Sequence, residues 1–201
     1  RGTNKVTQGF EDAAEMREHL EDCGLEVSAR EIDGRYVRLS IAPGIHGHKG
    51  SSSFTNALRS LGVLDSKRIP DVYLQASVAQ RWSLLQGLMD TDGSCNVNDG
   101  SCIFSAADGA LAAQVLALAS SLGLKASMHL RHGLYRGERR QYFQVHFLGQ
   151  ADRPPFRLAR KRARCVSRPA HQSRYRRVVG VEPAATRPVS CIQVARPDGQ
   201  Y

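Results

Sequence analysis

Residues 85–93 decide the fold, and they read Leu85-Gln86-Gly87-Leu88-Met89-Asp90-Thr91-Asp92-Gly93. The apolar residues recur at helical spacing, which predicts a helix over Leu84–Asp92. Gly87 has no side chain, so a second helix can approach its backbone closely, although glycine within a helix costs about 1 kcal/mol against alanine. The face that we expect at such a helix interface consists of Leu85, Gly87, Leu88 and Met89.

Two carboxylates stand at the expected C-terminal end of this helix. Asp90 and Asp92 precede Gly93, which is a natural C-cap. Because this end of a helix carries partial negative charge, each carboxylate costs roughly 0.3–1 kcal/mol there. A second such helix alongside would bring acidic tips together, where they could hold a divalent cation and a phosphate. An ordinary amphipathic helix that ends in an Asp-Gly turn is the alternative interpretation of these nine residues.

The stretch LQGLMDTDG resembles the LAGLIDADG motif of homing endonucleases. Eighteen residues before Leu85 lies Lys67-Arg68-Ile69-Pro70, and intein-borne LAGLIDADG enzymes commonly carry a similar K-x-I-P segment at about this distance before their second motif. The resemblance implies an α+β fold, namely a duplicated αββαββα unit with saddle-shaped sheets around a central helix pair. A short all-β fragment of an intein splicing domain is expected to follow it.

An internal repeat supports the duplication, because residues 3–60 and 101–160 carry the same succession of patterns. Each unit begins with a short strand and continues with a helix that ends at a Gly-Leu pair, and these pairs lie 99 residues apart. A hairpin and a further helix follow in each unit. The expected elements of the first unit are Lys5–Thr7, a helix up to Gly24-Leu25, strands Glu26–Glu31 and Tyr36–Ile41 around Asp33-Gly34, and a helix over Ser53–Leu61. Those of the second are Ile103–Ser105, a helix up to Gly123-Leu124, strands Ala126–Arg131 and Gln141–Leu148 around a turn at His132–Glu138, and a helix over Pro155–Arg164.

In this chain a motif helix precedes only the second unit, so we expect that of the first unit either to lie upstream of Arg1 or to have been removed or lost. The expected domains are a first endonuclease half (1–79), a second half (80–165), a basic linker (166–174) and a β-rich splicing-domain fragment (175–201). Without the partner helix, Leu85, Leu88 and Met89 are expected to expose an apolar patch through which the chain can self-associate.

The charge of the chain favours a polyanionic partner. Its 201 residues carry a net charge of +9, and the pI is about 9.7. Ten basic residues and no acidic ones lie from Arg153 to Arg177, so the rest of the chain sums to −1. This segment is either an arm that contacts phosphates or a solvated linker. No signal peptide and no apolar run of roughly 18 residues is visible, so a cytoplasmic protein without membrane contact is expected.

The five cysteines are odd in number, irregularly spaced and without a C-x-x-C pair, which argues for reduced thiols and against a zinc site. Near the end of the chain, β-like runs are expected over Tyr175–Glu182 and Val189–Val194. The second run is similar to the penultimate block of inteins, and Cys191 is its splicing-block candidate. We expect no splicing from this chain alone, because splicing needs an N-terminal Cys or Ser nucleophile and a terminal Asn.

The resemblance implies cleavage of double-stranded DNA at a long recognition site, with Mg²⁺ as cofactor. Asp92 matches the metal-binding acid of the family, and Lys67 matches the basic residue that stabilises charge or orients the nucleophilic water. The nearest candidates for the basic residue of the second half are Arg160 and Lys161. Base and phosphate contacts are expected from the hairpins, at Arg30, Arg35, Arg38, Arg131, Arg136, Arg139, Arg140 and Gln144.

Three alternatives to an active nuclease stay open. The domain can be a decayed nuclease that binds DNA without cutting it, a DNA-binding module on the same fold, or a part that only supports splicing. Retained Asp92 and Lys67 argue against the binding module, since binding alone needs neither. The fragment alone is expected to be inactive, and its partners would be the remainder of the intein and a host protein. The chain end resembles that of inteins in actinobacterial replicative helicases.

Overall fold

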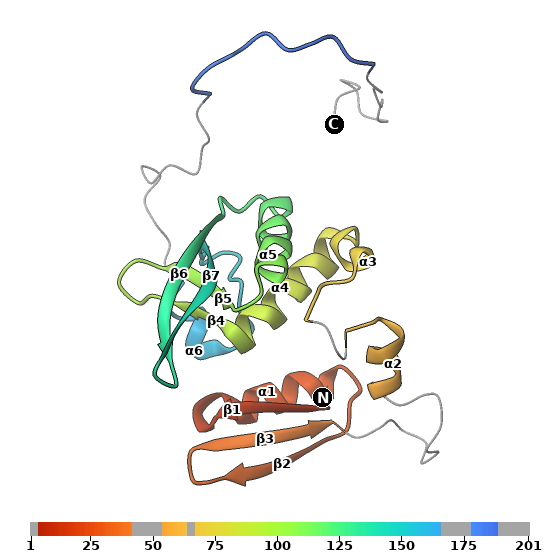
Figure 1. Ribbon diagram of the computed structural model, residues 1–201. Coiled ribbons are helices and arrows are strands. Elements are labelled where there is room, and N and C mark those ends of the chain that lie inside the picture. The colour runs from red at the N-terminus through yellow and green to blue at the C-terminus, as the bar shows by residue number, and fades with distance from the viewer. Residues whose placement is uncertain (1–3, 42–53, 64–66, 166–177, 189–201) are drawn as a thin grey trace.

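Two antiparallel sheets with helices packed on them form the molecule (Figure 1). The computed structural model describes residues 4–41, 54–63, 67–165 and 178–188. The first sheet has the order β1-β3-β2 and consists of β1 (Lys5–Gly9), β2 (Val27–Ile32) and β3 (Tyr36–Ile41). The second has the order β4-β5-β7-β6 and consists of β4 (Gly93–Cys95), β5 (Ser101–Ala106), β6 (Ser127–Tyr135) and β7 (Glu138–Leu148). The predicted α+β class with antiparallel sheets is confirmed.

The order of elements shows the repeat, since β1-α1-β2-β3 is matched by β5-α5-β6-β7. The helices are α1 (Phe10–Asp22), α2 (Phe54–Ser60), α3 (Asp71–Leu74), α4 (Val78–Asp92), α5 (Gly109–Ser121) and α6 (Ala159–Arg162). In each unit the first long helix packs on the sheet of its own unit. No helix in the described ranges combines the length and the apolar character that crossing a bilayer requires.

Both repeat helices end in the same way, as their Gly-Leu pairs predict. Gly24 and Gly123 have φ of +78° and +81°, a conformation that glycine adopts without steric cost. The next residue, Leu25 or Leu124, donates its backbone N–H to a carbonyl five residues earlier. This is the Schellman arrangement, which satisfies carbonyl groups that the end of a helix leaves unpaired.

The two hairpins turn more alike than the sequence suggests. In the first, Asp33 and Gly34 have φ of +51° and +61°, as the predicted type I′ turn requires. In the second, the predicted long turn over His132–Glu138 is wrong. Arg136 and Gly137 alone form the turn, with φ of +51° and +83°, and the strands stay paired up to it. A two-residue turn with positive φ matches strand twist, so pairing continues to the tip.

Two other predicted elements differ from the structure. Of the helix expected over Pro155–Arg164, only α6 is helical, because Asp90 binds the backbone N–H groups of residues 157 and 158 in the segment before it. The β-run expected over Tyr175–Glu182 is wrong in its described part, since residues 178–188 have no regular secondary structure. The run Val189–Val194, with Cys191, lies outside the described residues.

Each unit has an apolar core, and Leu158 extends from the second unit into the core of the first. The larger core surrounds α4 and α5, with Leu85, Met89 and Phe104 at 0–1% exposure. The smaller core lies between α1 and the first sheet. Leu158, from the segment that follows the second sheet, is fully buried in this first-unit core. The segment before α6 therefore connects the units, and it runs beside the end of α4.

Candidate active site

Helix α4 carries the motif, and the prediction of a helix over Leu84–Asp92 is confirmed. It begins at Ser77, which forms a capping box with Gln80: the Ser77 side chain accepts the Gln80 N–H, and the Gln80 side chain accepts the Ser77 N–H. Such a cap satisfies two backbone donors that the helix start leaves free. The cap fixes where the helix begins, and so helps to fix the position of its acidic C-terminal end.

The buried face of α4 differs from the expected interface with a second motif helix. Leu85 and Met89 are fully buried against the core of their own unit, and Leu88 is partly buried against the same core. The expected exposed apolar patch is therefore wrong, because these side chains lie on the helix side that carries Trp82. This removes the surface on which self-association was predicted. Gly87 is exposed, and among the described residues no atom lies within 4 Å of the Cβ that a side chain would add there.

The two motif carboxylates have opposite surroundings. Asp90 is 2% exposed, and its carboxylate accepts the backbone N–H groups of Arg157 (3.1 Å) and Leu158 (3.2 Å). Burial raises the pKa of Asp90, and these two hydrogen bonds oppose that shift. Asp92, two residues further, is exposed to solvent. Asp90 is therefore committed to holding the segment before α6, whereas the carboxylate of Asp92 is open to an incoming ligand.

Lys161 caps the C-terminal end of α4. Its ammonium group is buried and donates to three carbonyl oxygens, those of Met89 (3.0 Å), Asp90 (2.7 Å) and Gly93 (2.8 Å). Burial lowers the pKa of Lys161, while the Asp90 carboxylate raises it. A cation at the C-terminal end of a helix favours the dipole and so offsets the cost of the two carboxylates. All three ammonium donors are used here, and a catalytic role for Lys161 stays a prediction.

Gly93 ends the helix because of space. It is the C-cap, its N–H donates to the carbonyl of Met89, and its backbone is extended with φ of −95°. A Cβ at this position would lie 2.6 Å from the carbonyl oxygen of Met89. Any side chain would therefore displace the turn that presents Asp92.

Arg160 ties this region to the first unit. Its guanidinium forms a bidentate pair with the buried carboxylate of Asp12, at 3.0 and 2.6 Å, and also reaches Glu11 at 3.2 Å. The backbone N–H of Ala159 donates to both carboxylate oxygens of Glu15, at 2.9 and 3.0 Å. The acidic side of α1 thus holds the start of α6. The predicted catalytic role of Arg160 stays a prediction, and in the structure the side chain is an inter-unit contact.

The Asp12–Arg160 pair makes a pH-dependent contribution to stability. The hydrogen bond from Arg160 lowers the pKa of Asp12 below 3.8, so the pair stabilises the fold above that pH and is lost as pH falls through the lowered value. Since Arg160 is 39% exposed, we expect Asp12→Asn to cost only about 1–2 kcal/mol at pH 7. Urea unfolding at several pH values checks this. The difference between the variant and the parent should begin to shrink near pH 3.8 and vanish below the lowered pKa of Asp12, and a constant difference would contradict the assignment.

Lys67 lies two residues before Ile69, whose contacts hold this segment in place. Ile69 is 4% exposed, and its backbone N–H and carbonyl both bond to the side-chain amide of Gln114 on α5, each at 2.8 Å. Lys67 itself is exposed. Within the described part of the chain no hydrogen bond or ion pair joins Lys67 to Asp92, so the structure does not bring these two predicted residues into contact.

The predicted hairpin contacts fall into three groups. Arg30 and Arg38 are directly opposite partners on β2 and β3, on the face of the first sheet that points away from buried Leu39. On β6 and β7 the residues of the corresponding face, opposite to buried Val145, are Arg131, Arg140 and Gln144. Arg35 and Arg136 lie in the turns, and Arg139 falls on the other face of β7 by alternation. Five of the eight thus lie on outward sheet faces.

The outward face of the second sheet also carries residues that the sequence did not single out. His129 and His146 form an edge-to-face pair with ring centroids 5.1 Å apart, and His146 contacts Gln144 at 3.2 Å. Burial lowers the pKa of His146, and the charges of His129 and Arg131 add to this shift. Strand alternation around Gln144 is the signal that could have located both histidines.

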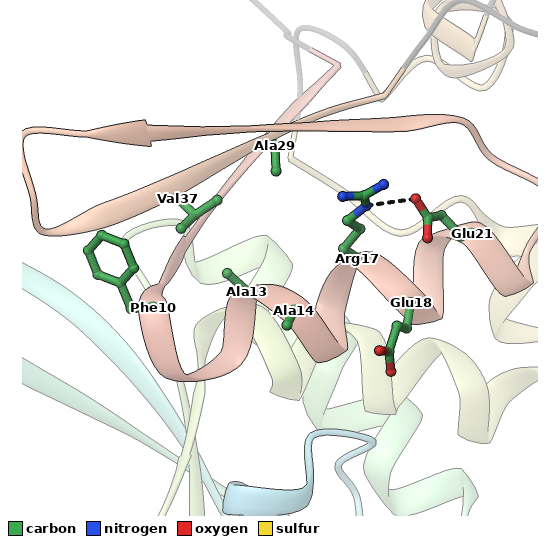
Figure 2. Close-up of a pocket in the computed structure, with 8 residues that line it drawn as sticks. All are labelled: Phe10, Ala13, Ala14, Arg17, Glu18, Glu21, Ala29 and Val37. Carbon is green, nitrogen blue, oxygen red and sulfur yellow. Dashed lines mark hydrogen bonds and ion pairs between the residues drawn. The ribbon is translucent and has the colours of Figure 1, made fainter.

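One groove of the first unit lies apart from the acidic helix end. It has a volume of about 440 Å³ and lies between α1 and strands β2 and β3 (Figure 2). Its polar lining includes Arg17 and Glu21, which pair with each other at 2.7 Å. Because none of the lining residues belongs to the candidate active site, we assign the groove no part in it.

The second unit combines a helix with an acidic end and a sheet with an outward basic face. Residues 79–157 match the family model of the LAGLIDADG-like domain, so this part of the chain is a LAGLIDADG-like domain. The chain is 34% identical over 141 residues to the replicative DNA helicase DnaB of Mycobacterium intracellulare, a match that covers 68% of this chain and 24% of that protein. The chain therefore spans about a quarter of that relative.

Solved structures of the homing endonuclease I-DmoI are also similar. A structure of its mesophilic variants is 14% identical, with a TM-score of 0.46 and a coverage of 71% of each chain. A structure of I-DmoI with DNA and Ca is 14% identical, with a TM-score of 0.45, and covers 71% of this chain and 66% of that one. A variant in complex with its target DNA in the presence of Mg is 13% identical, with a TM-score of 0.45 and a coverage of 71% of each chain.

Proposed function

We propose that this chain contains most of the nuclease domain of an intein, and that the intact domain hydrolyses phosphodiester bonds of double-stranded DNA at a long recognition site. The observation that carries the proposal is that the charged residues at the end of α4 differ in their exposure. Asp90 and Lys161 are buried and hold the helix end, while Asp92 is presented to solvent. A LAGLIDADG-like domain that only bound DNA would not need an open carboxylate at the end of this helix.

A divalent cation such as Mg²⁺ fits this carboxylate. Mg²⁺ is typically bound through one or two carboxylates, with water and phosphate oxygens as its other ligands. Asp92 would supply the protein ligand from this unit, since the oxygens of Asp90 are taken by backbone N–H groups. When bound, the ion would supply Lewis-acid activation of water and neutralise charge on the phosphate. Lys161 keeps the helix end in place, and Lys67 is our candidate for electrostatic stabilisation of the reacting phosphate.

The two sheets supply the surface for the duplex. A two-stranded ribbon fits the major groove of B-DNA, and arginine side chains contact both phosphates and guanine edges there. Arg30 with Arg38, and Arg131 with Arg140 and Gln144, lie on the outward faces of the hairpins. Glu138 pairs with Arg140 at 2.7 Å. On DNA binding, Arg140 would exchange this ion pair for a contact with the duplex.

The relative suggests the host. We infer that the intein interrupts a replicative helicase of the DnaB type, because 141 residues of the chain align with a protein of that name at 34% identity. Within the chain, we propose endonuclease halves over 1–79 and 80–165, a linker over 166–174 and a splicing-domain fragment over 175–201. The remainder of the intein and its exteins would then be the other partners.

The test of the proposal is cleavage of the uninterrupted host gene. The intact intein that contains this chain is mixed with a plasmid that carries the helicase gene without the intein, in the presence of Mg²⁺ or of a chelator. Cutting at one site that depends on the divalent ion supports the proposal. Binding at that site without cutting would instead establish the decayed nuclease, and absence of both binding and cutting would overturn the assignment.

DNA affinity should depend steeply on salt. If about six arginines meet phosphates, the logarithm of the binding constant falls with the logarithm of salt concentration at a slope of roughly −5. Replacement of Arg30 and Arg38 by alanine should make that slope shallower by about 2, since each lost phosphate contact removes about 0.9. Fluorescence anisotropy across a salt series measures this. Arg17→Ala is the matched control, because Arg17 pairs with Glu21 on α1, and an equal effect in the control would reject the hairpin surface.

A further inference from the structure

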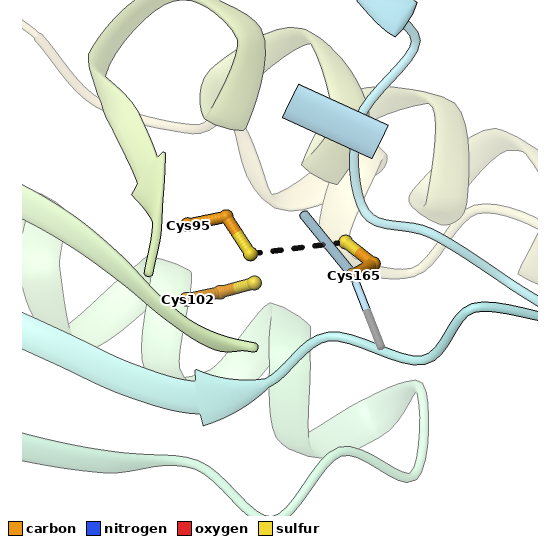
Figure 3. Close-up of side chains that lie close together, drawn as sticks. All are labelled: Cys95, Cys102 and Cys165. Atoms are coloured by element: carbon orange, nitrogen blue, oxygen red, sulfur yellow. Dashed lines mark hydrogen bonds between the residues drawn. The ribbon is translucent and has the colours of Figure 1, made fainter. Parts of the chain in front are cut away.

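Three cysteines that are distant in sequence converge behind the candidate active site (Figure 3). Cys95 lies on β4, Cys102 on β5 and Cys165 just after α6. Their sulfur atoms all lie within 4.8 Å of one another, and those of Cys95 and Cys165 are 4.0 Å apart. Each side chain is buried, at 4%, 0% and 7% exposure respectively. The spacing of the cysteines along the chain argued against a zinc site, but the fold brings these three cysteines together.

The geometry of the cluster is close to that of a metal thiolate site. Zinc–sulfur bonds of about 2.3 Å place sulfur ligands about 3.8 Å apart in a tetrahedron and about 4.0 Å apart in a triangle. The observed separations of 4.0 Å and below 4.8 Å need only small side-chain rotations to reach these values. Two of the ligands are already paired, because Cys95 and Cys102 are directly opposite each other across β4 and β5.

The chain backbone encloses the cluster tightly. Gly149 follows β7, and a Cβ there would lie 2.8 Å from the sulfur of Cys102 and 2.9 Å from that of Cys165. Its N–H donates to the carbonyl of Gly100, so bare backbone closes this side. An ordinary buried cysteine packs singly as a small apolar side chain. Here three thiols instead converge beneath the backbone of Gly149.

Two arginines place positive charge near the cluster. The positive charge of Arg162 acts on Cys165 and that of Arg164 on Cys95, and both arginines compensate negative charge at the cluster. A hydrogen bond from Cys102 lowers the pKa of Cys165 to about 7, whereas burial raises the pKa of Cys95 to about 11, and the hydrogen bond to Cys165 together with burial raises the pKa of Cys102.

We propose that Cys95, Cys102 and Cys165 bind one thiophilic d¹⁰ cation, for which Zn²⁺ is the probe. Binding forms three metal–sulfur bonds and releases the thiol protons to solvent. The ion would join β4 and β5 to the end of α6. Cys165 lies four residues after Lys161, and Cys95 lies two residues after Gly93, so the site would fix both sides of the cap on α4. The inference does not depend on nuclease activity.

The experiment uses the full chain and a version in which Cys23→Ser and Cys191→Ser leave only the three clustered thiols. Both are purified under reducing, anaerobic conditions, loaded with Zn²⁺ and desalted. Elemental analysis should give one zinc per chain in both, and zinc should slow the alkylation of the three thiols further than their burial alone does. Thermal unfolding should shift upward with zinc, because an ion that binds only the folded state stabilises it. Co²⁺ in place of zinc should give thiolate-to-cobalt absorption.

Single substitutions assign the ligands. Cys102→Ser and Cys165→Ser should each weaken zinc affinity by about 100-fold or more in competition with a chromophoric chelator, since even outer groups of metal sites contribute 10–100-fold. Cys23→Ser is the matched control, because Cys23 is exposed and outside the cluster, and it should change nothing. If a variant does not fold, the alkylation and cobalt measurements on the three-thiol chain decide. If the three-thiol chain retains no zinc, the proposed site is wrong. The same holds if replacement of Cys102 leaves the zinc affinity of that chain unchanged.

The choice of metal is decided in a parallel arm. Cu⁺ is also a soft d¹⁰ ion that thiolates select, and it is added under reducing conditions to the zinc-loaded three-thiol chain. Stoichiometric displacement of zinc would assign Cu⁺, and retention would assign Zn²⁺. A disulfide among the three cysteines in reduced, freshly purified protein would contradict both.

Discussion

Replacement of Asp92 by asparagine is expected to reduce DNA cleavage by about 100-fold or more, comparable with the loss of one electrostatic contact to a transition state. Asn keeps the shape of the side chain but removes the anionic ligand that would hold the divalent ion. Asp92 is exposed and near Lys161 rather than bonded to it, so the free energy of unfolding should stay within about 1 kcal/mol of the parent. DNA affinity should persist or rise slightly, because a negative charge leaves a phosphate-facing position.

Asp90→Asn is the matched control for this substitution, with the opposite pattern of effects. Asp90 accepts two backbone N–H groups in a buried place, and asparagine turns one acceptor oxygen into a donor. We expect a loss of about 1–3 kcal/mol in stability from the unsatisfied groups. Plasmid cleavage, anisotropy and urea unfolding on both variants separate the two roles. If Asp92→Asn cuts DNA like the parent, the assignment of the active site is wrong. Lys67→Ala should slow cleavage less than Asp92→Asn does.

Lys161→Met is expected to lower the free energy of unfolding by about 3 kcal/mol, because a buried cation is removed while its partners remain. The carbonyl oxygens of Met89, Asp90 and Gly93 lose their donor, and the helix end loses the charge that offsets its carboxylates. Methionine fills a similar volume, so little of the loss comes from a cavity. Urea unfolding followed by circular dichroism measures the effect.

Arg162→Met controls for the loss of a positive charge on the same turn. Arg162 is exposed and adjacent in sequence, so its replacement should change stability by less than about 0.5 kcal/mol. Equal destabilisation by both substitutions would show that net charge, and not the helix cap, is responsible. A Lys161→Met chain as stable as the parent would contradict the three-carbonyl cap.

Local signals in the sequence predicted the elements well. The apolar spacing of residues 84–89 predicted α4, the Gly-Leu pairs predicted the ends of α1 and α5, and Asp33-Gly34 predicted the first turn. These features depend on neighbours a few residues away, where periodicity and backbone conformation act directly. The second turn was missed because arginine at positive φ in Arg136-Gly137 is a weaker signal than Asp-Gly.

Properties of the site that depend on distant partners were not predictable. Nothing in the motif shows that Asp90 meets the backbone of residues 157 and 158, or that Lys161 returns to cap the helix. Nor does the sequence show that Arg160 pairs with Asp12, 148 residues away. The expected apolar patch failed for the same reason, since which neighbours cover Leu85 and Met89 is a question of tertiary packing.

The sequence by itself determined the repeat, the antiparallel α+β class, the motif helix and the acidic pair at its end. Each of these follows from the local pattern of apolar, glycine and charged residues. Only the tertiary structure decided that Asp90 is buried while Asp92 is open to solvent. It also decided that Lys161 and Arg160 make structural contacts, and that three cysteines distant in sequence lie together. The physical reason is that burial and hydrogen-bond partners arise from segments 60 to 150 residues apart, and side-chain chemistry depends on those surroundings.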